Sequence, residues 1–139
     1  MIKKNHITTK INEKWIDEQG IVWMKAIEGV HMDLEDLKED HERSLELMGS
    51  HKILVMYDAR NHFTISPEGR AFLSAGILNE NRIATAVISP NLGVRLLVNF
   101  MNAINPPKSP IKMFGNEKDA LKWLQTHKDK AEKESLQVH

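Results

Sequence analysis

The sequence alternates short apolar runs with amphipathic segments, and this alternation limits the possible folds more than any other feature. The runs Ile53–Tyr57 and Ile83–Ile88 are each followed by a segment with apolar residues at three- and four-residue spacing. Repeated strand–helix–strand units connect through right-handed crossovers and build a parallel sheet covered by helices. Because Ile53–Tyr57 is continuously apolar, we expect it at the sheet centre with both faces covered.

Turn and capping residues mark the remaining elements. The segments Ile11–Ile16 and Ile21–Ile27 flank the turn Asp17–Gly20 and predict an N-terminal hairpin, while Ile111–Phe114 predicts a last strand. Helices are predicted after the N-caps Asp33, Ser66 and Asn116, with Pro67 at a first helical position, and from about Leu92 to Ile104 before Pro106-Pro107. Gly49 stands where the first helix needs a left-handed residue at its end.

These elements predict an α/β fold in the order ββαβαβαβα. The sheet is mixed and mostly parallel, with about five strands, an N-terminal hairpin and about four helices. A length of 139 residues suits one domain, and neither a repeat nor a linker separates a second. We therefore expect a single domain over residues 1–127. Residues 128–139 are highly charged and are expected to form a frayed tail.

Charge and composition limit the classes of molecule that this protein is expected to bind. Lys+Arg and Asp+Glu both number 19, so the formal net charge is +0 and offers no long-range field for nucleic acid. The absence of cysteine fits a reducing compartment, and neither an apolar signal core nor a membrane-spanning run occurs. We expect a cytoplasmic protein that binds a protein or a small molecule.

Sequence motifs of common enzyme classes are missing. The chain contains no G-x-G-x-x-G or G-x-x-x-x-G-K-[ST] phosphate loop and no G-x-S-x-G nucleophile turn. Seven histidines are present, but no two lie four residues apart on one predicted helix, as a zinc pair requires. We therefore predict no metal, no cofactor and no enzymatic activity.

The densest set of polar side chains follows the central predicted strand. Its members are Asp58, Arg60, Asn61, His62, Thr64, Ser66 and Glu68. In parallel sheets this carboxyl edge is where ligands and partners bind. As a hydrolase site, Asp58 and His62 would form an acid–base pair with the hydroxyl of Ser66 or Thr64. As structure, Ser66 caps a helix, Glu68 complements its dipole and Asp58 accepts backbone N–H groups, and we favour this second interpretation with the loop as a partner-binding surface.

A broad apolar stripe runs along the predicted helix near residues 92–104. It consists of Leu92, Leu96, Leu97, Phe100, Met101 and Ile104. We favour the interpretation of this stripe as core, and the alternative is that it is wider than the sheet can cover. The surplus would form a homodimer face or an apolar pocket, for which Leu96, Phe100 and Met101 are the candidate lining residues.

The order of elements and the segment 53–73 resemble the STAS domains of bacterial anti-sigma-factor antagonists, the SpoIIAA-like group, which are related in fold to Sec14-type lipid-binding domains. Ile53–Asp58 is similar to the family's apolar strand ending in Asp, and Ile65–Gly69 to its I-D-S-S-G-L turn. The closing segment Met113–Leu124 is similar to the ending of uncharacterised bacterial members. The resemblance spans roughly residues 8–126.

This resemblance implies a non-enzymatic, regulatory protein-binding module. The serine that family members use as a phosphorylation switch falls at Pro67, which has no hydroxyl, and Ser66 stands one position earlier. The resemblance therefore implies the fold and the interaction role of the family. It does not imply phosphorylation at the usual position, because Pro67 stands there. The alternative that it implies, through the Sec14 relation, is a module that binds a lipid or another apolar molecule in a pocket.

Overall fold

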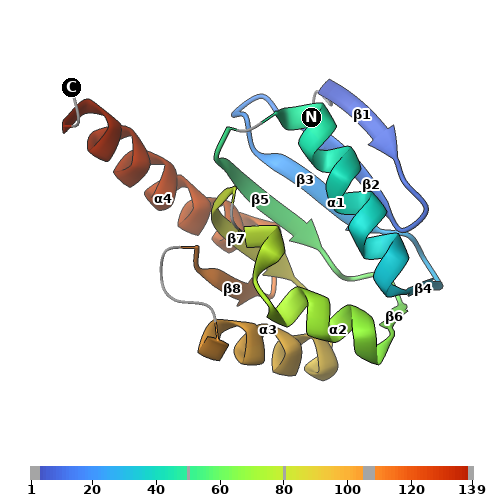
Figure 1. The fold of residues 1–139 in the computed structure, drawn as a ribbon. Coiled ribbons are helices and arrows are strands. Elements are labelled where there is room, and N and C mark those ends of the chain that lie inside the picture. Colours follow the sequence, from blue (N-terminus) through green and yellow to red (C-terminus); the bar gives the residue numbers. More distant parts are fainter. Residues whose placement is uncertain (1–3, 50, 80, 105–108, 138–139) are drawn as a thin grey trace.

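The computed structural model describes residues 4–49, 51–79, 81–104 and 109–137, and it has a six-stranded mixed sheet at its centre (Figure 1). The strand order is β1-β2-β3-β5-β7-β8. These strands are β1 (Lys4–Thr8), β2 (Asn12–Ile16), β3 (Val22–Ala26), β5 (Ile53–Asp58), β7 (Arg82–Ile88) and β8 (Ile111–Phe114). The first three are antiparallel neighbours, and β3, β5, β7 and β8 run parallel. The predicted mixed, mostly parallel fold is confirmed.

Four α-helices cover the two faces of this sheet. They are α1 (Leu34–Met48), α2 (Pro67–Ser74), α3 (Leu92–Ile104) and α4 (Glu117–Gln137). Leu37 of α1, Leu73 of α2 and Val98 of α3 pack in clusters on one face. Ala120 and Leu124 of α4 pack on the other face. Figure 1 shows α1, α2 and α3 together on one side, with α4 extending away from the sheet toward the C-terminus.

The central position predicted for Ile53–Tyr57 is confirmed. Strand β5 lies between β3 and β7, and its side chains alternate between the two helical layers. Leu54 and Met56 join the cluster beneath α4, whereas Val55 packs on the opposite face. A strand covered on both faces has to be apolar at every position, because no side chain is left facing water.

Three short strands were not predicted. β1 extends the sheet beyond the N-terminal hairpin, and β4 (Val30–Met32) pairs in parallel with β6 (Phe63–Ile65) in a separate two-stranded sheet. β1 has one apolar residue among five, and β4 and β6 are only three residues long, so none of them shows the periodic pattern that identifies longer strands. The β4–β6 pair matters for function, because it fixes the loop that follows β5.

The helix boundaries follow most of the capping signals. Asp36 accepts a hydrogen bond from the backbone N–H of Asp33 at 3.0 Å, and Gly49 ends α1 with a φ of +67°. Helix α4 continues to Gln137, so residues 128–137 are helical where a frayed tail was expected. A helix needs no apolar stripe to continue when its sequence is rich in Lys, Glu and Gln, which favour helix. Residues 105–108, with the two prolines predicted to end α3, lie outside the described residues.

No helix in the described ranges combines the length and the apolar character needed to cross a membrane.

Candidate functional site

The polar loop that follows β5 is held by a buried carboxylate. Asp58, the last residue of β5, is only 4% exposed. Its Oδ1 accepts hydrogen bonds from the backbone N (3.1 Å) and Nε (2.9 Å) of Arg60, and its Oδ2 accepts one from Nη2 at 2.8 Å. Burial opposes ionisation of Asp58, but the hydrogen bonds from Arg60 outweigh it and hold the pKa of the carboxyl below its usual value. The side chain thus stays charged and closes the turn.

Arg60 extends this contact to the opposite layer. Its Nη2 also donates to Oε1 of Glu117 at 2.9 Å, at the first residue of α4. The hydrogen bond to Asp58 is the main reason why the pKa of Arg60 lies above its ordinary value. The guanidinium therefore joins the end of the central strand to the start of α4. It remains partly accessible at the surface.

The next loop residues are anchored to the β3–β4 connection. Asn61 Nδ2 donates to the carbonyl of Ala26 at 2.9 Å, and the backbone N of His62 donates to Glu28 Oε2 at 3.1 Å. Thr64 lies on β6, where its hydroxyl is 2.7 Å from Nδ1 of His31 on β4. These contacts fix the backbone of the loop while the side chains of His62 and Thr64 stay exposed.

Ser66 has the structural role predicted for it. Its Oγ accepts a hydrogen bond from the backbone N of Gly69 at 3.0 Å, and Pro67 occupies the first turn of α2. Ser66 is buried, whereas Glu68 is exposed in the same turn. Arg60 engages both oxygens of Asp58, and the Ser66 hydroxyl accepts the capping hydrogen bond, as the structural interpretation of these residues predicts.

The loop forms one wall of a surface groove of about 510 Å³. Among the predicted partner-binding residues, four line it: Arg60, Asn61, His62 and Thr64. Asp58, Ser66 and Glu68 do not line it. A second part of the lining was missed by the sequence analysis and comes from Arg70 on α2 and from Pro90, Asn91, Gly93 and Val94 around the start of α3. Asn91 caps that helix by accepting hydrogen bonds from the backbone N of Gly93 at 2.7 Å and of Val94 at 3.3 Å.

Two of the three residues predicted to line an apolar pocket, Leu96 and Phe100, line one surface pocket beside α2, whereas Met101 does not line it. Leu96 and Phe100 lie on the outer face of α3, 62% and 55% exposed, together with Leu92. Met101 is buried against the sheet and lines an interior cavity instead. Successive residues of a helix are 100° apart, so a stripe of this width has one edge inside the protein and the other in solvent. The predicted apolar surplus on this helix is therefore present at the surface.

The interior cavity lies between the sheet and the layer of α1, α2 and α3. Its volume is about 110 Å³. Most of the lining is apolar, but one part of it is polar, where Asn12, Asp40, Tyr57, Arg82 and Thr85 contribute.

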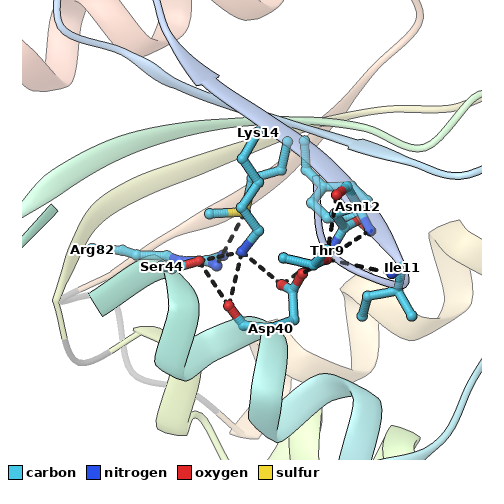
Figure 2. Close-up of polar contacts among 9 residues, drawn as sticks. Thr9, Ile11, Asn12, Lys14, Asp40, Ser44 and Arg82 are labelled. Atoms are coloured by element: carbon cyan, nitrogen blue, oxygen red, sulfur yellow. Dashed lines mark hydrogen bonds and ion pairs between the residues drawn. The ribbon is translucent and has the colours of Figure 1, made fainter. Parts of the chain in front are cut away.

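A buried polar network beneath α1 was not anticipated by the sequence analysis (Figure 2). Lys14 on β2 is 0% exposed and reaches α1, where its Nζ lies 2.6 Å from Asp40 Oδ2. The same ammonium donates to the Asp40 carbonyl at 3.1 Å and to the hydroxyl of Ser44. Burial lowers the pKa of Lys14, and the charge of Asp40 works in the opposite direction. Lys14 has three N–H donors, and each of them has an acceptor.

The network continues from Asp40 toward the sheet. Oδ1 of Asp40 accepts from the Thr9 hydroxyl, and its Oδ2 accepts from Asn12 Nδ2 at 3.2 Å. The Asn12 Oδ1 in turn accepts from the hydroxyl of Tyr57 at 2.7 Å. Burial, reinforced by the charge of Asp40, raises the pKa of Tyr57, so this hydroxyl remains protonated and serves as a donor.

A second cation, Arg82 at the start of β7, lies near this network. Burial lowers its pKa to about 10, and the charge of Asp40 partly compensates. Its contacts are long, 3.5 Å from Nη1 to the Thr85 hydroxyl and 3.8 Å from Nη2 to the sulfur of Met24. Within the described residues, no carboxylate lies within ion-pair distance of its guanidinium.

Comparison with known proteins places this architecture in a family. Residues 14–128 match the family model described as "Domain of unknown function (DUF7793)". The chain belongs to the DUF7793 family. No curated protein matches the sequence.

A solved structure has the same fold as this DUF7793 chain. It is an uncharacterised protein of the DUF3478 family from Shewanella loihica PV-4, described as having a SpoIIAA-like fold. The two share 18% sequence identity with a TM-score of 0.62, over 89% of this chain and 98% of the other. The resemblance to the SpoIIAA-like group is therefore confirmed at the level of the fold.

Proposed function

We propose that this chain is a cytoplasmic, non-enzymatic, regulatory module of the STAS type that binds a protein partner in the groove beside the 58–69 loop. The observation that supports the proposal most is the groove itself. It lies at the carboxyl ends of β5 and β7, the edge at which parallel α/β sheets present their binding sites. The missing cysteines fit a reducing compartment.

The chemistry of the groove favours an acidic segment of the partner. Arg60, His62 and Arg70 line it, and the part of its lining that the structure describes contains neither Asp nor Glu. The charge of Arg60 is balanced by Asp58 and Glu117, but Arg70 donates to the uncharged carbonyl of Ile65 at 2.7 Å. Arg70 therefore keeps a guanidinium charge that a carboxylate of the partner can pair with.

The proposal includes no catalysis and no phosphorylation at the usual family position. Pro67 replaces the hydroxyl that would accept phosphate, and the neighbouring Ser66 is buried as a helix cap. The module would act by binding alone. Turnover of an ester or phosphoester that Ser66→Ala abolishes would contradict this part of the proposal.

Site-directed photo-crosslinking in the native cell tests the docking surface. A photo-crosslinking residue replaces His62 in the groove, and a second protein carries it in place of Glu42, which is exposed on α1. We expect one acidic-segment protein to crosslink through position 62 and not through position 42. Identical products from both positions would contradict the proposal.

Competition with unlabelled protein adds a matched pair of variants. Wild type and Arg95→Glu, which alters an exposed residue of α3 outside the groove, should suppress the crosslink equally. Arg70→Glu should suppress it at least tenfold less, because it reverses the charge offered to the partner. Equal competition by Arg70→Glu would remove the groove from the interface.

The interior cavity favours a second candidate function, the binding of a small, largely apolar molecule. Its wall is mostly apolar and it lies between the sheet and three helices, as binding sites for small molecules do. Native mass spectrometry of gently purified protein tests this function. A co-purifying small molecule would support it, and an empty protein that also takes up no added apolar ligand would oppose it.

A further inference from the structure

The interior cavity combines an apolar wall with an imbalance of charge. Lys14 and Arg82 bring two cations to this region, and Asp40 brings one carboxylate. A buried charge is stable only when it is paired or fully hydrogen-bonded. Lys14 and Asp40 are buried and Arg82 is partly buried, so the partners of these three groups determine what the cavity can bind.

Asp40 is fully used by groups other than Arg82. Its two carboxylate oxygens accept hydrogen bonds from Thr9, Asn12 and Lys14, and its carbonyl accepts from Lys14 and Ser44. Lys14 and Asp40 thus form a complete ion pair. The charge of Arg82 is the one left over.

Arg82 retains unused hydrogen-bonding capacity. A guanidinium has five N–H donors, but this one makes two long contacts, to Thr85 and to the sulfur of Met24. Hydrogen bonds from Arg to a carboxylate are usually about 2.7–2.9 Å long and frequently bidentate. Because Arg82 lines the cavity, an anion inside the cavity can reach it.

The rest of the cavity fits a hydrocarbon group. The apolar wall includes Leu73, Leu97, Val98 and Met101. The polar part holds Asn12, Tyr57, Thr85 and the already paired Asp40 beside Arg82. At the packing density of protein interiors, about 0.75, a volume of about 110 Å³ holds a ligand of about 80 Å³, which corresponds to about five or six non-hydrogen atoms.

We propose that the cavity binds a small organic monocarboxylate, whose carboxylate pairs with Arg82 and whose hydrocarbon group contacts the apolar wall. This inference rests on the second candidate function and adds the chemical class of the ligand. It is independent of the partner groove beside the 58–69 loop.

Butyrate and its neutral counterpart butyramide, of the same size, are the probes. The methionine methyl groups are labelled with ¹³C and titrated at constant ionic strength. Met24, Met32 and Met101 line the cavity, while Met56 is buried on the opposite face of the sheet and serves as an internal control. We expect butyrate to shift the three cavity methyls with a Kd at least tenfold lower than that of butyramide, and to leave Met56 unchanged.

Two variants locate the anion site. Arg82→Met should fold, because it removes an unpaired cation and keeps an apolar side chain of similar length. It should weaken butyrate binding at least tenfold and leave butyramide binding unchanged. Arg95→Met, which alters an exposed position of α3, should leave both affinities unchanged.

The outcomes separate this inference from the function on which it rests. Equal affinity of the wild type for butyrate and butyramide would overturn the anion claim while supporting an apolar-ligand module. Shifts of the cavity methyls with neither compound would overturn both. Butyrate binding that Arg82→Met leaves unchanged would remove Arg82 as the anion partner. If Arg82→Met does not fold, the comparison of the two probes on the wild type still decides.

Discussion

Replacing Asp40 by Asn tests the buried network most sharply. The substitution keeps the shape of the side chain but removes the negative charge that lies 2.6 Å from the Lys14 ammonium. Breaking a buried ion pair by removing one partner costs about 3–5 kcal/mol, because the other charge remains buried without compensation. We expect a loss of this size in the free energy of unfolding near neutral pH. The loss is a large part of the stability of an ordinary domain.

The pH dependence gives the prediction a second, independent feature. Burial lowers the pKa of Lys14 in the folded state below the ordinary value of 10.5 that it has when unfolded. Between these two values the unfolded chain binds more protons than the folded protein, so the free energy of unfolding increases with pH in this window. The same stability is lost when the pH is lowered through the folded-state pKa. In Asp40→Asn the carboxylate charge that raises the pKa of Lys14 is gone, so the folded-state pKa of Lys14 falls further. The window between the folded and unfolded pKa values therefore extends closer to neutral pH. Asp40→Asn should therefore regain more stability at alkaline pH than the wild type does.

Urea unfolding followed by tryptophan fluorescence measures both effects. Trp15 and Trp23 are buried and stacked with their ring centres 5.7 Å apart, so their emission reports the loss of the core. Glu42→Gln, which neutralises an exposed carboxylate on the same helix, is the matched control and should stay within about 0.5 kcal/mol of wild type. If Asp40→Asn were as stable as this control near pH 7, the buried ion pair would not contribute as argued.

Three further predictions concern the loop and its caps. Ser66→Ala should cost about 1 kcal/mol and Ser66→Asp should be near neutral, and equal urea midpoints for Ala and wild type would reject the cap. Gly69→Ala should cost about 1–3 kcal/mol, because its Cβ would lie 2.9 Å from a neighbouring side chain, whereas Gly115→Ala has open space, and thermal melts of equal midpoint would contradict the crowding. The charge of Asp58 stabilises the fold above its ordinary pKa of 3.8, and this stabilisation is lost as pH falls through the lower folded-state pKa that Arg60 maintains. Arg60→Met should therefore raise the pH at the midpoint of acid unfolding, measured by circular dichroism. An unchanged midpoint would exclude that role of Arg60.

The parts of the fold that sequence could predict are those with a strong local signal. The continuous run Ile53–Tyr57 predicts a central strand because such a run has no face for water. The Ser66-Pro67 step predicts a helix start because a capping hydroxyl and a fixed φ both belong at that position. Each of these signals is complete within a few residues, so no knowledge of distant contacts was needed.

The buried network depends on contacts that no local pattern encodes. Lys14 lies in the polar segment Asn12–Lys14, which by composition belongs at the surface. Its burial follows only when Asp40 and Ser44, more than 25 residues away in sequence, are placed over β2 by helix α1. The four-residue spacing of Asp40 and Ser44 predicts that both lie on one face of a helix. It does not predict that Lys14 contacts them.

The sequence predicted the part of the partner groove that the loop after β5 forms, but not the part that α2 and the start of α3 form. Arg60 and His62 follow the central strand directly, so the topology of a parallel sheet places them at its carboxyl edge. Arg70 lines the same groove only because α2 returns beside the loop, and Asn91 does so because β7 ends at the same edge. The second wall comes from tertiary packing and not from the loop sequence.

Hydrogen exchange of the complex with the crosslinked partner tests the central claim, that the functional surface is the carboxyl edge of the sheet, most directly. Exchange of backbone amides is compared between the free protein and the complex by mass spectrometry. The account predicts slower exchange in residues 60–70 and 89–94, with no change in the peptides of α4. Slower exchange in α4 or on the exposed side of α1, with residues 60–70 unaffected, would contradict it.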